Sequence, residues 1–112
     1  MDAPNNPSSS DRLQKLQAML SHSPQDAFLL YALGMEHKKR SEFSAALGYF
    51  AQVIARDPDH CPAYQQVALT HQEAGDPQAA RNSLLAGIAA AQRKGDAHAA
   101  DEMQAALTEL EG

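Results

Sequence analysis

Residues 27–60 read AFLLYALGMEHKKRSEFSAALGYFAQVIARDPDH, and the 34 residues that follow repeat the same spacing of side-chain types. Six positions of the first copy recur in kind in the second, where Leu30, Leu33, Gly34, His37, Ala46 and Phe50 correspond to Tyr64, Val67, Ala68, His71, Ala80 and Leu84. Apolar, small and histidine positions therefore keep one register over both copies. This register indicates a single structural unit that is present twice.

The period and the pattern together resemble the tetratricopeptide repeat, a hairpin of two helices with Leu-Gly, Ala, Phe and Pro at fixed positions. The first copy carries Leu33-Gly34, Ala46, Phe50 and Pro58 at those places. The main departures are His37 and His71 where the family has an aromatic residue, and Gln92 where the second copy would have proline. The resemblance implies an all-α fold, a short right-handed α-solenoid of antiparallel helical hairpins whose small residues permit close helix packing.

Composition favours one helical domain without a nucleic-acid surface. The chain has 112 residues and a net charge of −5, and only 5% of its residues are aromatic. A phosphate-binding surface needs many basic contacts, and this sequence has no basic cluster beyond residues 38–40. The single cysteine, Cys61, excludes an intrachain disulfide and a cysteine-based zinc site, and it is typical of a reducing cytoplasm.

The domain organisation follows from the helix signals. We expect a disordered tail at 1–9, which is polar and lacks the apolar run of a signal peptide or membrane anchor. A single domain then spans 10–112, and its predicted parts are a half-repeat helix at 10–22, repeats at 27–60 and 61–94, and a capping helix at 96–111.

Three short stretches predict helix starts, because each places a capping side chain directly before a proline. They are Ser23-Pro24, Asp57-Pro58 and Asp76-Pro77. In the first helix, Leu13, Leu16, Met19 and Leu20 follow the spacing of one apolar face. That face is expected to cover the amino-terminal end of the array.

Two histidine groups raise the question of a metal site. His37 and His71 occupy the same place in successive repeats, at an expected separation of ~10 Å, the diameter of one helix. His60-Cys61 lies close to Asp57 and Asp59. The alternative interpretations are that the two repeat histidines fill interior space, that Asp57 caps a helix, and that Cys61 is an apolar filler. We expect no metal, no cofactor and no enzymatic activity, since no nucleophile, base and orienting group stand out together.

The resemblance also implies a function, because the first helices of successive repeats line a concave groove that binds a peptide or helix of a partner protein. The positions that match the groove lining are Phe28, Tyr31, Met35, Lys38, Gln65, Leu69 and Gln72. The groove is therefore expected to be mainly apolar. The alternative is self-coverage by the amino-terminal helix or by a second copy of the chain, which would make a structural homo-oligomer such as a homodimer.

Charged residues at the two ends of the array have plain interpretations. The basic run Lys38-Lys39-Arg40 complements the negative carboxyl end of its helix, or alternatively binds an acidic ligand. The acids of the last helix are expected on its solvated outer side; they are Asp101, Glu102, Glu109 and Glu111. Some family members hold an acidic tail with Lys and Asn in the groove, and here Tyr31 and Met35 stand at those places, so the resemblance disfavours that ligand.

Overall fold

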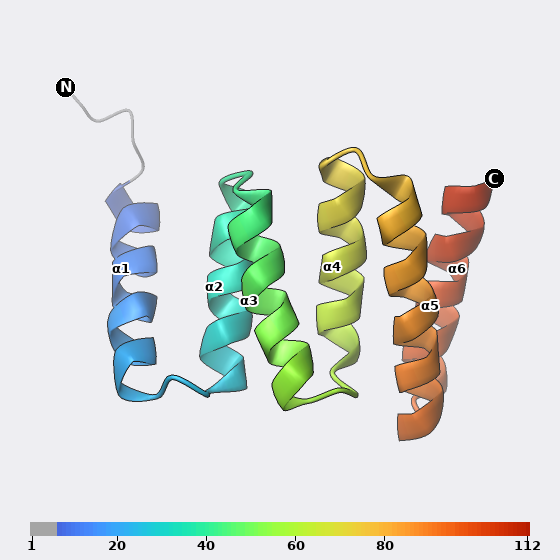
Figure 1. Cartoon of the computed structure of the whole chain (residues 1–112), viewed down its shortest axis with the longest axis horizontal. Coiled ribbons are helices and arrows are strands. Elements are labelled where there is room, and N and C mark those ends of the chain that lie inside the picture. The colour runs from blue at the N-terminus through green and yellow to red at the C-terminus, as the bar shows by residue number, and fades with distance from the viewer. Residues whose placement is uncertain (1–6) are drawn as a thin grey trace.

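The computed structural model describes residues 7–112, with side chains from residue 11 onward, and this range forms six helices in a row (Figure 1). They are α1 (Pro7–His22), α2 (Ala27–Lys39), α3 (Phe43–Arg56), α4 (Cys61–Glu73), α5 (Pro77–Lys94) and α6 (Ala97–Glu111). Each helix packs against the next one along the chain, and no strand occurs in the range described. The predicted all-α solenoid of antiparallel hairpins is confirmed.

The two central hairpins, α2–α3 and α4–α5, bury the same repeat positions. Ala46 and Phe50 of α3 are fully buried. Their counterparts on α5 are buried too, since Ala80 has no exposed surface and Leu84 is 2% exposed. Gly34 and Ala68 are buried on the facing helices. The small residues thus lie where one helix approaches the other, which allows the larger side chains to fill the interior.

The second hairpin differs from the first at one inner repeat position. Leu33 is fully buried, whereas its counterpart Val67 is only half-buried. His37 and His71 are half-buried alike. The prediction of an inner position is therefore confirmed for Leu33 and only partly met at Val67, His37 and His71. The second copy, which is the weaker match in sequence, has the looser core at Val67.

Helix α6 completes the carboxy-terminal core. Met103 is fully buried and Leu107 is 5% exposed, and both pack in one cluster with Leu84 and Ala91 of α5. Helix α5 has 18 residues where α3 has 14, because glutamine stands at the proline position and lets the helix continue. The left-handed Gly95, at φ 75°, then ends α5.

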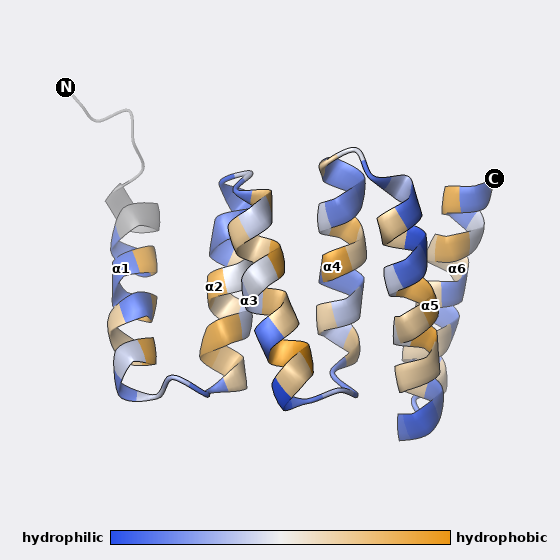
Figure 2. Ribbon diagram, viewed as in Figure 1, coloured by the Kyte–Doolittle hydropathy of each residue, from blue (hydrophilic) through white to orange (hydrophobic). Residues whose placement is uncertain are grey.

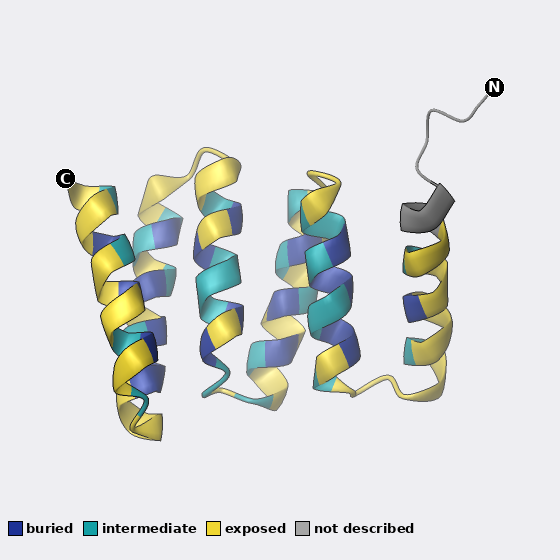
Figure 3. Ribbon diagram, turned by 180° about the vertical axis from the view of Figure 1, so that it is seen from behind, coloured by how far each residue is buried: buried dark blue, intermediate teal, exposed yellow. Residues whose placement is uncertain are grey.

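Helix α1 is attached by a narrow apolar stripe. Leu16 is its one buried side chain from residue 11 onward, and Leu13 and Leu20 are half-buried beside it. The coloured part of α1 is mostly exposed in Figure 3, and in Figure 2 it alternates hydrophilic and hydrophobic residues. The expectation for Met19 was wrong, since this side chain is 52% exposed. These three leucines pack against Leu29 and Leu33 of α2.

The predicted tail at 1–9 is only partly covered by the structure. Residues 1–6 lie outside those described, and α1 begins at Pro7, three residues before the predicted start at residue 10. Proline suits the first turn of a helix, because its φ is already helical and its missing amide hydrogen is not needed there.

Two of the three predicted helix starts are corrected. Helix α2 begins after Asp26, whose carboxylate accepts a hydrogen bond from the Leu29 amide at 3.2 Å, and Ser23-Pro24 lies in the preceding turn. Helix α4 begins after His60, whose Nδ1 accepts from the Ala63 amide at 3.1 Å. The prediction at Asp76-Pro77 is confirmed, since Asp76 caps α5.

Asp57 belongs to the end of α3 instead of the start of α4. Its carboxylate accepts a hydrogen bond from the Asp59 amide at 3.2 Å and so closes the turn that contains Pro58. Pro62 takes the position in the first turn of α4 that had been assigned to Pro58.

None of the helices in the described range is both long enough and apolar enough to cross a lipid bilayer.

Candidate functional site

The predicted groove residues lie on α2 and α4. Most of them line one of two hollows, and the others lie near the start of α2. We call the first the α2–α4 hollow, which is lined by Arg12, Met35, Glu36, Lys38, Lys39, Ser41 and Glu73. We call the second the α4–α6 hollow, which is lined by Gln65, Gln66, Ala68, Leu69, Gln72, Leu84, Glu102, Met103 and Ala106. They adjoin at α4, where the neighbouring residues Gln72 and Glu73 belong to one hollow each.

Phe28 and Tyr31, the first two predicted groove residues, line neither hollow. Phe28 is 75% exposed near the start of α2, so its ring is available to a ligand. Tyr31 is half-buried, and its ring centroid lies 5.6 Å from that of Phe50 and 5.3 Å from that of His60. Burial raises the pKa of the Tyr31 phenol, and a hydrogen bond with Gln66 opposes that rise. Tyr31 therefore packs chiefly within the protein.

The α2–α4 hollow has a volume of about 720 Å³ and a wall of paired charges. Lys38 Nζ lies 3.2 Å from a carboxylate oxygen of Glu73, which ties α2 to α4. Glu36, with a side chain only 5% exposed, receives Arg12 of α1 at 2.8 Å and Lys39 at 3.4 Å. These cations are already partnered within the chain, so an acidic ligand would have to displace an internal carboxylate.

The basic run at 38–40 thus pairs with acids of the chain itself. Besides the two lysines, Arg40 Nε lies 3.4 Å from a carboxylate oxygen of Glu42. Neither the helix-dipole interpretation nor the acidic-ligand interpretation of the run had included these partners. The pair of Lys38 with Glu73 joins α2 to α4 and could not be inferred from helix spacing, whereas the pair of Lys39 with Glu36 lies within α2 at i,i+3 spacing.

The α4–α6 hollow is smaller, about 270 Å³, and combines an apolar floor with amide side chains. Its floor includes Leu84 and Met103, which are buried, whereas Leu69 on its wall is 44% exposed. Gln65 Nε2 donates a hydrogen bond to Glu102 Oε1 at 3.3 Å across the hollow. Three predicted groove residues, Gln65, Leu69 and Gln72, are brought together here.

Helix α6 supplies one wall of this hollow, which the sequence interpretation missed. Glu102 was expected on the outer, solvated side of the helix, and it instead faces α4. A signal was present, since Ala100, Met103 and Leu107 stand 36 residues beyond Tyr64, Val67 and His71. The change of period from 34 to 36 reflects the longer α5, and a search at fixed period does not detect it.

Of the two repeat histidines considered as metal ligands, His37 has partners within the protein. His37 Nδ1 lies 2.8 Å from Glu42 Oε1, and its ring stacks on that of Tyr49 at 5.3 Å. His71 is half-buried on α4. In the part of the chain that the structure describes, no three His, Cys, Asp or Glu side chains gather as a metal site would require.

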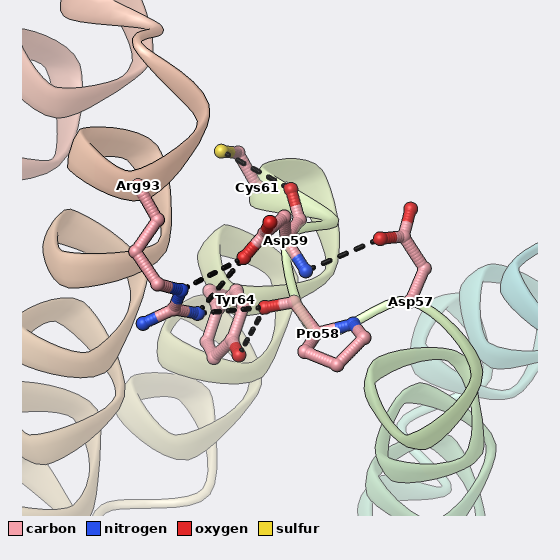
Figure 4. A network of polar contacts seen from close by, with 6 residues as sticks. All are labelled: Asp57, Pro58, Asp59, Cys61, Tyr64 and Arg93. Carbon is pink, nitrogen blue, oxygen red and sulfur yellow. Dashed lines mark hydrogen bonds and ion pairs between the residues drawn. The ribbon is translucent and has the colours of Figure 1, made fainter.

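The second histidine group belongs to a polar network that fastens the α3–α4 turn to α5 (Figure 4). Arg93 donates to Asp59 Oδ1 at 3.0 Å and to the Pro58 carbonyl at 3.2 Å, and Tyr64 donates to the same carbonyl at 2.7 Å. Cys61 is 2% exposed, and its thiol donates to the Asp59 carbonyl at 3.6 Å. These contacts give the residues around Cys61 a structural role.

Comparisons with known proteins agree with this architecture. The chain is 26% identical over 99 residues to a TPR repeat-containing protein of Pseudomonas aeruginosa, and the match covers 88% of this chain and 94% of that protein. A tetratricopeptide repeat domain protein from Salinibacter ruber is 30% identical, with a TM-score of 0.74 over 80% of this chain and 90% of that one. No protein-family model matches the chain.

A third structure resembles the chain in fold. PcrH, solved in complex with the chaperone binding region of PopD, superposes with a TM-score of 0.82 over 92% of this chain and 78% of that one. The two sequences are 19% identical, so this likeness concerns the arrangement of helices.

Proposed function

Because the chain belongs to the tetratricopeptide repeat family, we propose that it is a protein-interaction module that binds a polypeptide segment of a partner along α2, α4 and α6. The observation that carries the proposal is Leu69, a leucine 44% exposed on the wall of a hollow whose floor is apolar. An exposed apolar side chain beside a ready hollow is typical of a surface that a partner covers.

The fold of PcrH supports this proposal, since that protein holds a segment of PopD and has the same arrangement of helices. Binding is favoured over catalysis because the hollows contain amides, paired charges and aliphatic side chains instead of a nucleophile with its base. A cytoplasmic setting is part of the proposal, since the one cysteine is a buried thiol.

Self-coverage of the groove is the alternative function, and the described part of α1 does not provide it. Helix α1 packs on Leu29 and Leu33 of α2, while Phe28 and Leu69 stay exposed. A second copy of the chain is then the remaining form of self-coverage. The outer side of α6 offers it little apolar area, because Asp101, Gln104 and Thr108 are exposed there.

The test compares two leucines of nearly equal exposure. Leu69 is 44% exposed in the α4–α6 hollow, and Leu85 on α5 is 42% exposed and lines neither hollow. The immobilised chain is used to capture proteins from a lysate of its source, and the captured set is quantified by mass spectrometry. We expect Leu69→Asp to lose the captured set and Leu85→Asp to keep it, with unchanged circular dichroism for both.

Sedimentation velocity of the same variants distinguishes the alternative. A monomeric wild type supports the interaction module. A wild-type dimer that Leu69→Asp separates and Leu85→Asp preserves would instead favour the structural homo-oligomer. Equal capture by both variants would contradict a groove at Leu69.

A further inference from the structure

The α4–α6 hollow has a chemical asymmetry that bears on the kind of partner it fits. Its floor is aliphatic, with Leu84 2% exposed and Met103 fully buried. Its volume of about 270 Å³ lies just below the roughly 300–1,000 Å³ of small-molecule pockets. The hollow is therefore suited to one or two side chains of a polypeptide.

Glu102 on the rim lacks the lysine or arginine partner that several other acids of the described range have. Glu36, Glu73 and Glu111 each pair with a lysine or arginine. Glu102, 53% exposed at its side chain, is approached by the Gln65 amide at 3.3 Å and by His98 Nε2 at 3.3 Å. His98 is itself 85% exposed, so it is a loosely held partner. Within the described range no lysine or arginine forms an ion pair with Glu102.

The hollow therefore combines an aliphatic floor with a carboxylate that, in the described range, has no lysine or arginine partner.

We propose that the α4–α6 hollow receives a partner segment in which an aliphatic side chain enters between Leu69 and Met103 and an adjacent lysine or arginine pairs with Glu102. This inference rests on the proposed function and adds the chemistry of the segment. The aliphatic residue supplies most of the binding free energy through burial, and the basic residue supplies selectivity and a faster association.

The test uses a phage-displayed library of random dodecapeptides panned against the full chain. We expect the enriched peptides to carry Leu, Ile or Met next to Lys or Arg. A synthetic peptide of that kind is then titrated by fluorescence anisotropy. We expect Glu102→Gln to weaken its binding by about twofold to fivefold, the range of an exposed ion pair.

Two controls isolate the charge at residue 102. Asp101→Asn removes the same charge from the neighbouring residue, which lines another surface between α5 and α6, and it should leave the affinity unchanged. Glu102→Lys should weaken binding of the basic peptide, and replacing the basic residue of the peptide by glutamate should weaken its binding to the wild type. The two changes together should restore binding, because the charges are then exchanged.

The outcomes separate this inference from the proposed function. The inference would be overturned if the enriched peptides depend on Leu69 but carry no basic residue and bind Glu102→Gln as well as the wild type. The proposed groove would still stand in that case. Absence of any Leu69-dependent peptide would count against the groove itself.

Discussion

Gly34 on α2 and Phe50 on α3 lie in such close contact that a Cβ atom at Gly34 would stand 2.5 Å from Cε1 of the ring. Real Cβ atoms do not approach a ring carbon so closely. The Phe50 side chain is fully buried, so it cannot move aside without disturbing the core. The missing side chain at Gly34 therefore sets the separation of the two helices in the first hairpin.

The first prediction concerns this contact. Gly34→Ala should lower the free energy of unfolding by about 1–3 kcal/mol through overpacking, although alanine favours a helix by about 1 kcal/mol over glycine. Gly48→Ala on α3 is the matched control, because a Cβ there meets nothing within 4 Å. It should stabilise the protein by up to about 1 kcal/mol. Chemical denaturation of both variants checks the opposite signs.

The second repeat suggests a compensating change for Gly34→Ala. Its counterparts of Gly34 and Phe50 are Ala68 and Leu84, a larger residue facing a smaller one. Gly34→Ala combined with Phe50→Leu should therefore recover part of the stability lost by the two single changes. A coupling of about 0.5–3 kcal/mol is expected in the double-mutant cycle. Strictly additive effects would contradict the proposed contact.

This pair also shows why the repeat could be predicted from sequence. Side-chain size at the closest approach of two helices is constrained by geometry, so Gly34 and Ala68 carry a signal that survives other changes. The register of the two hairpins was found from such positions. The α4–α6 hollow is predictable only in part, because Glu102 lies on α6, which follows the preceding repeat at a period of 36 residues and not 34.

The helix starts were predicted less well, for a related reason. Asp57 and His60 are three residues apart, and each has a side chain that can accept a hydrogen bond from an amide. Which of them caps a helix depends on where the chain leaves the turn. That path is fixed by contacts distant in sequence, such as Arg93 with Asp59, and local patterns do not contain it.

A second prediction addresses helix α1. Its amide hydrogens from residue 13 onward should exchange faster than those of α2 to α5, because Leu16 is its one buried side chain in the described range. Arg12→Ala removes the ion pair to Glu36 and should speed exchange in α1 further. Hydrogen–deuterium exchange measured by mass spectrometry checks both statements. Equal protection of α1 and α3 would contradict them.

A third prediction compares two methionines at opposite ends of the molecule. Met103→Ala should lower the free energy of unfolding by about 2–5 kcal/mol, since the side chain is fully buried against α5. Met19→Ala, at a side chain 52% exposed, should change it by less than about 0.5 kcal/mol. Thermal unfolding followed by circular dichroism measures both.

Deletion of residues 97–112 extends the same argument to the whole of α6. This change exposes Leu84 and Ala91, which are buried against the helix. We expect a cooperative loss of helicity, because two hairpins alone fall below the roughly three repeats that a stable array needs. A truncated chain that melts like the full one would show that α6 adds nothing to the core.

The last prediction concerns pH. Burial raises the pKa of the Cys61 thiol, although the charge of Lys94 opposes the rise. An unfolded thiol loses its proton near pH ~8.5, whereas the folded one keeps it to a higher pH. Above the pKa of the unfolded thiol, the unfolded chain binds fewer protons than the folded chain, so the free energy of unfolding falls as pH rises. The stabilisation is complete below the unfolded pKa and is lost as pH rises through the folded pKa.

Denaturant titrations between pH ~7 and ~9.5 measure this fall, in a range below the ordinary tyrosine pKa of about 10. Cys61→Ala removes the thiol and should have a flatter dependence on pH, whatever its absolute stability. The comparison uses slopes, so the packing lost with the sulfur does not affect it. Parallel slopes for the two proteins would mean that the thiol titrates alike in the folded and unfolded chains, which contradicts its burial between the α3–α4 turn and α5.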